Sequence, residues 1–360
     1  MDSCDVLIVG GGPAGSSCAW ALRNSGRDVT ILDKQVFPRD KVCGGWITPD
    51  VLRELEIDPV EYARGRVLQP ITSFRAGPIG GSAVEIRYGK PVSYGIRRRE
   101  FDDYLLKRAG ARPLLGTPLT SLERSGDQWI ANGQIRARMV VGAGGHFCPV
   151  ARLTGAKSGG EEAVVAQEVE FEMDAQQLAG CRVSGEMPEL YFCADMKGYG
   201  WCFRKENFLN VGLGRADQHK LSAHVADFLK FLKETARLSF DVPAMHGHAY
   251  LLNGTSTRAI ASDGVMLIGD AAGLAYPQSG EGIRPAIESG LLAAKTILAG
   301  NGLASYASTI AGRRNQSLAG VGRYLPARWI NALARTLLQT PWFVRGVVLD
   351  KWFLHTSPSI

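Results

Sequence analysis

The stretch Asp5-Val6-Leu7-Ile8-Val9-Gly10-Gly11-Gly12-Pro13-Ala14-Gly15 decides the fold of this chain. Its apolar first half has the length of a strand, and the Ala-rich sequence that continues to about residue 24 has the composition of a helix. Between the two, Gly10 permits a tight turn, Gly12 lets a pyrophosphate approach the backbone, and Gly15 allows the helix to pack closely on the strand. The order of strand, glycine turn and helix predicts a dinucleotide site.

A second apolar run, Asp28-Val29-Thr30-Ile31-Leu32, leads to Asp33, about where a ribose-binding carboxylate should lie. This run completes a predicted βαβ unit. Because NAD and FAD both bind to such units, these residues leave the identity of the dinucleotide open.

Residues far along the chain bear on that choice. Val265–Ile268 is typical of a buried strand, and it leads into Gly269-Asp270-Ala271-Ala272-Gly273 and then Gly280-Glu281-Gly282-Ile283. Asp270 would lie at the carboxyl edge of a strand, where ligands collect in α/β sheets. The next predicted helix, Ile283–Leu298, would offer N–H groups and a positive dipole end that suit an electron-rich flavin carbonyl. The alternative is an ordinary strand, turn and helix with a capping Asp.

Length and composition are those of a globular chain with about two domains: 360 residues, 45% hydrophobic and 21% charged. The seven Cys residues include no C-x-x-C pair, so we expect free thiols in a reducing compartment and hence a cytoplasmic protein. The N-terminus lacks a basic region and a cleavage pattern, and no run of about 18 uncharged apolar residues occurs. We therefore expect neither a signal peptide nor a membrane span.

The net charge of +6 lies in residues 301–360, which hold seven Lys and Arg and one acid. Within this tail, Ala327–Leu338 has the spacing of an amphipathic helix, with Leu333 on its apolar face and Arg328 and Arg335 on its basic face. Two interpretations stay open: peripheral contact with a membrane, or packing of the apolar face on the protein's own core. No recognition motif accompanies the basic residues, so we expect no nucleic-acid partner.

Further motifs give the chain a family resemblance. Arg98-x-x-Phe101-Asp102-x-x-Leu105, Val141-Gly142-Ala143-Gly144-Gly145 and the two glycine motifs above together resemble the FAD-dependent enzymes of the para-hydroxybenzoate hydroxylase fold, over residues 1 to about 300. Lys41-Val42-Cys43-Gly44-Gly45 and Tyr199-Gly200-Trp201-Cys202-Phe203-Arg204-Lys205 resemble the geranylgeranyl reductase family within that fold. The chain departs from the family pattern at Gly144, where Asp is usual, and at Arg204, where Pro is usual.

The resemblance implies that FAD is the cofactor and that transiently bound NAD(P)H or another donor reduces it. It implies reduction of isoprenoid double bonds, with hydride from N5 of the reduced flavin. It implies that the glycine turn and Asp33 hold the ADP half of FAD. It also implies that Arg98 lies along the cofactor and that Asp270 contacts the pyrophosphate–ribityl region. The predicted cofactor residues are Gly10, Gly12, Pro13, Ala14, Gly15, Asp33, Lys34, Lys41, Gly44, Gly45, Arg98, Gly269, Asp270, Gly280, Gly282 and Ile283.

The resemblance also marks a candidate substrate site. Cys43 is the residue that the family pattern places near the flavin, so it is a candidate proton donor; the alternative is a packing residue. If Tyr199, Trp201 and Phe203 belong to a strand, all three point to one face, which would line a prenyl channel or form ordinary sheet core. The adjacent cations Arg204 and Lys205 would either hold a polar head group or be solvated, and the second is the usual case.

These observations predict an α/β fold with a Rossmann-type FAD-binding domain, an antiparallel-sheet substrate domain and a C-terminal helical tail. The predicted FAD-binding domain is discontinuous, the substrate domain includes a helix at 221–238, and the tail is basic and rich in Trp. The predicted bounds are 1–65, 92–155 and 255–310 for the FAD-binding domain, 66–91 and 156–254 for the substrate domain, and 311–360 for the tail.

Other functions remain as alternatives. A monooxygenase or, less favoured, a halogenase on an aromatic or lipidic substrate would use the same fold, and fold alone cannot separate these activities. A flavoprotein without enzymatic activity has little sequence support. His246 and His248 would lie on one side of an extended segment, but no third ligand is near in sequence, so we expect no metal site.

Overall fold

The computed structural model describes residues 2–157, 161, 163–217, 220–300, 302–316 and 327–356, with side chains for all of these except 313–316 and 327–331. The chain divides into two compact units. The first comprises Met1–Asp40, Arg99–Glu162 and Tyr250–Gly320, and the second comprises Lys41–Arg98, Ala163–Ala249 and Val321–Ile360. The division expected from the sequence differs, since it assigned 41–65 to the FAD-binding domain and treated 311–360 as a separate tail.

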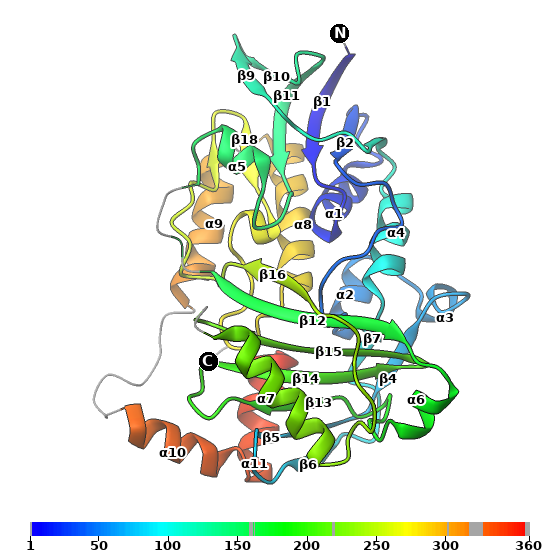
Figure 1. Cartoon of the computed structure of the whole chain (residues 1–360). Helices are drawn as coiled ribbons and strands as arrows, with labels where there is room; N and C mark the ends of the chain where they lie inside the picture. Colours follow the sequence, from blue (N-terminus) through cyan, green and yellow to red (C-terminus); the bar gives the residue numbers. More distant parts are fainter. Residues whose placement is uncertain are drawn as a thin grey trace. The chain divides into compact units, whose positions relative to one another are not determined.

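A mainly parallel sheet forms the centre of the first unit (Figure 1). Strand β1 (Asp2–Val9) lies between β2 (Val29–Asp33) and β11 (Ile135–Gly142), and all three run parallel. Parallel strands β8 (Arg112–Leu115) and β18 (Val265–Leu267) extend the sheet beside β2 and β11. The other elements of this unit are α1 (Pro13–Leu22), α4 (Arg98–Arg108), β9 (Leu122–Ser125), β10 (Gln128–Ala131), α5 (Pro149–Leu153), β17 (Ala261–Ser262), the 3₁₀ turn η1 (Gly269–Ala271), α8 (Ile283–Ala299) and α9 (Gly302–Gln316).

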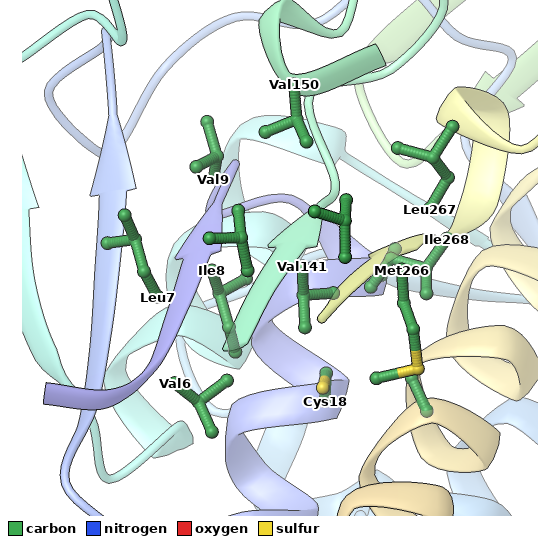
Figure 2. Close-up of a cluster of buried hydrophobic side chains, with 14 of the residues drawn as sticks. Val6, Leu7, Ile8, Val9, Cys18, Val141, Val150, Met266, Leu267 and Ile268 are labelled. Atoms are coloured by element: carbon green, nitrogen blue, oxygen red, sulfur yellow. The ribbon is translucent and has the colours of Figure 1, made fainter. Parts of the chain in front are cut away.

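The core of the first unit is apolar because its central strands are covered on their faces. Ile8 of β1, Val141 of β11 and Met266 of β18 are fully buried, as is Cys18 of α1. Figure 2 shows these side chains gathered between the strands and α1. Helices α1 and α8 also pack on each other so closely that a Cβ at Gly290 would lie 2.4 Å from a backbone carbonyl oxygen of α1.

A seven-stranded sheet forms the centre of the second unit, in the order β16-β12-β15-β14-β13-β5-β6. The pairs β12–β15, β15–β14, β14–β13 and β5–β6 are antiparallel as expected, whereas β13 and β5 run parallel. Its strands are β5 (Ser73–Pro78), β6 (Val84–Arg87), β12 (Val164–Glu172), β13 (Glu189–Phe192), β14 (Gly198–Lys205), β15 (Phe208–Arg215) and β16 (His246–Tyr250). A smaller sheet and short helices accompany it: β3 (Trp46–Ile47), α2 (Pro49–Glu54), α3 (Pro59–Tyr62), β4 (Leu68–Ile71), β7 (Ser93–Ile96) and α6 (Ala175–Gly180).

The two faces of this sheet carry different partners. Helix α7 (Leu221–Glu234), predicted from the sequence, packs on one face against β12 and β15 (Figure 1). Gly200 of β14 makes room for it, since a Cβ there would lie 2.6 Å from the ring of Phe228. The opposite face carries the side chains of Trp201 and Phe203, because alternate residues of a strand point to opposite faces.

The described part of the C-terminal tail is helical, as expected. It contains α10 (Ala327–Leu337), α11 (Pro341–Phe343) and the π-helical segment η2 (Val344–Phe353). Phe353 is buried, and its ring stacks on Trp46 with centroids 5.4 Å apart, so the end of the tail belongs to the core of the second unit. In contrast, Leu333 of α10 is 56% exposed. The side chain of Arg328 lies outside the described residues. Among the described helices, none has the length and apolar character that a membrane span requires.

Candidate functional site

The glycine turn after β1 has no room for side chains. Gly10 has φ of +117°, and a Cβ there would lie 2.4 Å from the carbonyl oxygen of Ala143. A Cβ at Gly15 would lie 1.9 Å from the carbonyl oxygen of Gly10. Gly12 is the N-cap of α1, which has no side-chain cap and no acidic residue in its first turn. The N–H groups at this helix end therefore suit an anionic pyrophosphate.

Asp33 lies beside this turn at the end of β2. Its Oδ2 accepts a hydrogen bond of 2.7 Å from the backbone N–H of Gly11, and its Oδ1 accepts one of 2.8 Å from the N–H of Gln35. Each carboxylate oxygen has a further lone pair for a ribose hydroxyl. Lys34, which follows, is exposed.

The second glycine motif brings Asp270 to the start of α8. A Cβ at Gly282, the N-cap of α8, would lie 3.1 Å from Oδ1 of Asp270. Gly269 is held at φ of +59° and donates its N–H to Oγ of Ser289 at 2.9 Å. Gly280 has φ of +67°, and Ile283 is buried. The structure thus brings together the predicted residues of this motif.

Two cations near these motifs were missed by the sequence reasoning. Nη2 of Arg39 lies 3.1 Å from Oδ2 of Asp102, whose side chain is fully buried, and a Cβ at Gly12 would lie 3.4 Å from the same Nη2. Asp102 belongs to the Arg98-x-x-Phe101-Asp102 motif. An acidic residue on the buried face of a helix indicates a cationic partner, and this signal could have identified Arg39. Arg258 donates to the carbonyl oxygens of Ala271 and His146, at 2.9 and 3.0 Å, and pairs with Glu161. No sequence pattern marks Arg258.

The first unit therefore has the features that FAD requires. Its glycine turn is a cradle that side chains would fill, the N-terminal end of α1 has no side-chain cap, and a carboxylate lies beside the turn. The remaining predicted cofactor residues, Lys41, Gly44, Gly45 and Arg98, belong to the second unit. Arg98 is buried and is the first residue of α4, whose other residues belong to the first unit. Nζ of Lys41 lies 3.1 Å from Nε2 of His248.

In the second unit, the Cys43-Gly44-Gly45 turn lies on the aromatic face of the sheet. A Cβ at Gly44 would lie 3.4 Å from Phe203, and one at Gly45, where φ is +64°, would lie 2.2 Å from the carbonyl oxygen of Ile96. The N–H of Gly45 points at Sγ of Cys43 at 3.5 Å. Glycine at both positions lets the turn lie directly on the sheet.

The three predicted substrate residues share β14 and its aromatic face. Ring centroids of Tyr199 and Trp201 are 6.0 Å apart, and those of Phe203 and Trp46 are 6.4 Å apart. Trp201 and Phe203 are buried, whereas Tyr199 is half-buried and also contacts Phe353, at 5.4 Å.

The expectation that both cations at the end of β14 are solvated is wrong for Lys205. Its side chain is only 1% exposed, and its Nζ donates to Oε2 of Glu170 at 2.6 Å and to the carbonyl oxygen of Ile96 at 2.9 Å. A buried ammonium requires such partners. Arg204 points the other way, and its Nε donates to the carbonyl oxygen of Glu206.

A buried carboxyl group with a raised pKa lies on this face of the sheet. Glu168 of β12 is buried beneath the turn, and this burial raises the pKa of its carboxyl to about 7, against the opposing effect of the N–H of Cys43 and of Lys205.

Among the described residues, no group of three or more His, Cys, Asp or Glu is arranged to hold a metal ion.

Comparison with known proteins agrees with this architecture. Residues 3–305 match the family model described as FAD binding domain. The chain is 31% identical over 333 residues to a menaquinone reductase of Mycobacterium tuberculosis, covering 82% of this chain and 77% of that protein. It is 28% identical over 312 residues to a digeranylgeranylglycerophospholipid reductase of Methanocaldococcus jannaschii, covering 81% and 76%.

Solved structures confirm the fold. A geranylgeranyl bacteriochlorophyll reductase-like protein of Thermoplasma acidophilum has a TM-score of 0.71 at 22% identity, covering 94% of this chain and 88% of that chain. A flavin-dependent brominase has a TM-score of 0.72 at 17% identity, covering 98% and 92%. Since the family model spans most of the chain and the reductases align along more than four fifths of it, this protein belongs to the geranylgeranyl reductase-like family of FAD-binding proteins and is an FAD-dependent oxidoreductase.

Proposed function

We propose that this enzyme reduces carbon–carbon double bonds in the isoprenoid chain of a lipid. The observation that carries the proposal is the Cys43–Gly45 turn, seated on a face of the sheet that is rich in aromatic rings. Aromatic rings suit a hydrocarbon chain. The name of the digeranylgeranylglycerophospholipid reductase supports the same substrate class, because that lipid, as named, carries geranylgeranyl chains.

Different residues of the chain would bind FAD, hold the hydrocarbon and donate the proton. Those of the glycine turn and of the Gly269–Ile283 motif would bind FAD, which when bound supplies hydride from its reduced form. Tyr199, Trp201 and Phe203 would hold the hydrocarbon and exclude water. Cys43 would donate the proton that completes the addition of two hydrogen atoms across the double bond. NAD(P)H, bound transiently, or another donor would supply the electrons.

We also propose that the C-terminal tail contacts a membrane, where such a lipid resides. Leu333 is 56% and Trp342 66% exposed, and Arg335, Arg345 and Lys351 are exposed in the same segment. Exposed apolar and basic side chains together favour an anionic lipid surface.

A monooxygenase or halogenase remains the alternative, and it rests on fold neighbours such as the brominase. The test is to reduce the purified protein anaerobically and add geranylgeranyl lipids of two kinds, a glycerophospholipid and a menaquinone. We expect flavin reoxidation without oxygen and a gain of two hydrogen atoms per reduced bond, measured by mass spectrometry. Reoxidation only after air is admitted, with oxygen in the product, would replace our proposal with the alternative.

A further inference from the structure

We infer that Glu168 and Asn210 are positioning residues that hold the backbone of Cys43 from both sides and so fix the direction of its thiol. The N–H of Cys43 donates to Oε1 of Glu168, and Nδ2 of Asn210 donates to the carbonyl oxygen of Cys43 at 3.1 Å. We call these two hydrogen bonds the clamp. The catalytic consequence of the clamp rests on the proposed function, whereas the effect of the clamp on the direction of the thiol does not.

The strand register brings the two clamp residues to one place. Glu168 of β12 pairs with Gly212 of β15, and Asn210 lies two residues before Gly212 on the same strand. Because residues two apart on a strand share a face, both side chains rise from the aromatic face of the sheet. The sequence separations from Cys43 are 125 and 167 residues.

Gly212 makes this arrangement sterically possible. A Cβ there would lie 2.7 Å from Cβ of Glu168 and 2.3 Å from the indole of Trp201. Any larger residue would push apart the side chains of Glu168 and Trp201 that flank it.

Asn210 is itself oriented by a buried hydrogen bond. Nε1 of Trp201, which can only donate, bonds to Oδ1 of Asn210 at 2.7 Å. The amide nitrogen must then face the other way, toward the carbonyl oxygen of Cys43 and Oε2 of Glu170, at 3.1 and 3.4 Å. Trp201 therefore contributes to the site through its N–H as well as through its ring.

The burial of Glu168 costs more free energy than a residue that only fills space would justify. The residue is only 4% exposed, and its Oε2 is buried without a hydrogen-bond partner among the described residues. A buried carboxyl whose second oxygen is unsatisfied destabilises the fold, so its presence needs a compensating role. The hydrogen bond to the N–H of Cys43 is the polar contact that it makes there.

Cys43 offers a direct readout of the clamp. All seven cysteines are described, and six of them are buried, whereas Cys43 is half-buried. A small alkylating reagent should therefore react first at Cys43 in the folded holoenzyme, and peptide mass spectrometry identifies the site. This measurement needs no lipid substrate.

The experiment compares Glu168→Ala and Asn210→Ala with Gln167→Ala. Gln167 is the neighbour of Glu168 on β12, and its side chain faces Ser222 of α7 on the other side of the sheet. We expect each clamp variant to keep its FAD, shown by the visible spectrum, and to change the iodoacetamide rate constant of Cys43 by about tenfold, which corresponds to the loss of one hydrogen bond worth about 1.4 kcal/mol. Gln167→Ala should leave the rate constant unchanged.

Glu168→Gln separates hydrogen bonding from charge and serves if Glu168→Ala does not fold. The charged groups that face Glu168 are Lys205, Glu170 and Lys41. Gln retains an acceptor but cannot ionise, so we expect alkylation closer to that of the wild type and the loss of any step near pH 7 in its pH profile.

A folded, flavin-loaded Glu168→Ala or Asn210→Ala variant whose Cys43 reacts within twofold of the wild type would overturn the inference. A wild-type step near pH 7 that persists in Glu168→Gln would overturn the part assigned to Glu168. If the rates change but no lipid is reduced by any form, the clamp stands and the proposed function fails.

Discussion

At Gly15 the chain has no space for a side chain, because a Cβ there would lie 1.9 Å from the carbonyl oxygen of Gly10. Gly15→Ala must move the glycine turn or α1, so we expect at least about tenfold weaker FAD binding and a lower melting temperature. Flavin absorbance per protein and a thermal melt measure both. Gly312→Ala is the control, since Gly312 is an exposed helical glycine with nothing within 4 Å of its Cβ. Equal flavin content and melting temperature in the two variants would contradict the assignment of the turn.

Glu168 should make the stability of the protein depend on pH. Burial raises the pKa of its carboxyl from 4.5 to about 7 in the folded state. Its contribution to the free energy of unfolding is therefore fully present below about pH 4.5 and is lost as the pH rises through about 7, on the order of 3 kcal/mol in all. We expect Glu168→Gln to gain stability relative to the wild type between pH 5 and pH 8, measured by urea unfolding. Parallel pH profiles for the two proteins would show that Glu168 does not titrate in this range.

Segment η2 belongs to the core of the second unit, although its sequence does not predict this burial. Phe353 at its end is 1% exposed and stacks on Trp46, whereas Trp342 in α11 is 66% exposed. We expect Phe353→Ala to cost about 3–5 kcal/mol of unfolding free energy and Trp342→Ala less than about 0.5 kcal/mol. Chemical denaturation of both variants tests this, and a similar loss in both would mean that Phe353 is not a core residue.

At the scale of the whole molecule, the charge is concentrated in the last 60 residues, where the net charge of +6 resides. Reversing Arg335 and Lys351 to Glu should weaken binding to vesicles that contain an anionic lipid by about 1 kcal/mol or more per residue, and added salt should reduce the difference. Reversing Arg64 and Lys90, which are exposed elsewhere in the second unit, is the matched control of total charge. Equal loss in both pairs would indicate a general charge effect and no membrane contact by the tail.

The local structure of both glycine motifs could be predicted from the sequence. Gly10, Gly12 and Gly15 lie between a strand and a helix, and Asp270 follows a strand, because strand length, glycine geometry and helical composition are properties of neighbouring residues. The amphipathic helix at 327–337 and the alternation of Tyr199, Trp201 and Phe203 are predictable for the same reason. The resemblance to the family added FAD, which the residues alone had left open.

The residues that surround these motifs depended on tertiary structure. Lys205 was expected in solvent, yet it is buried, because Glu170 on another strand supplies the acceptor that its ammonium needs. Arg258 reaches the carbonyl oxygens of His146 and Ala271 in the first unit, and Glu168 and Asn210 reach Cys43 from more than a hundred residues away. The sequence alone determined the family, the cofactor cradle and the local elements, since these depend on short-range pattern. Only the tertiary structure decided which polar groups are buried together, because strand register and close backbone approach bring them into contact.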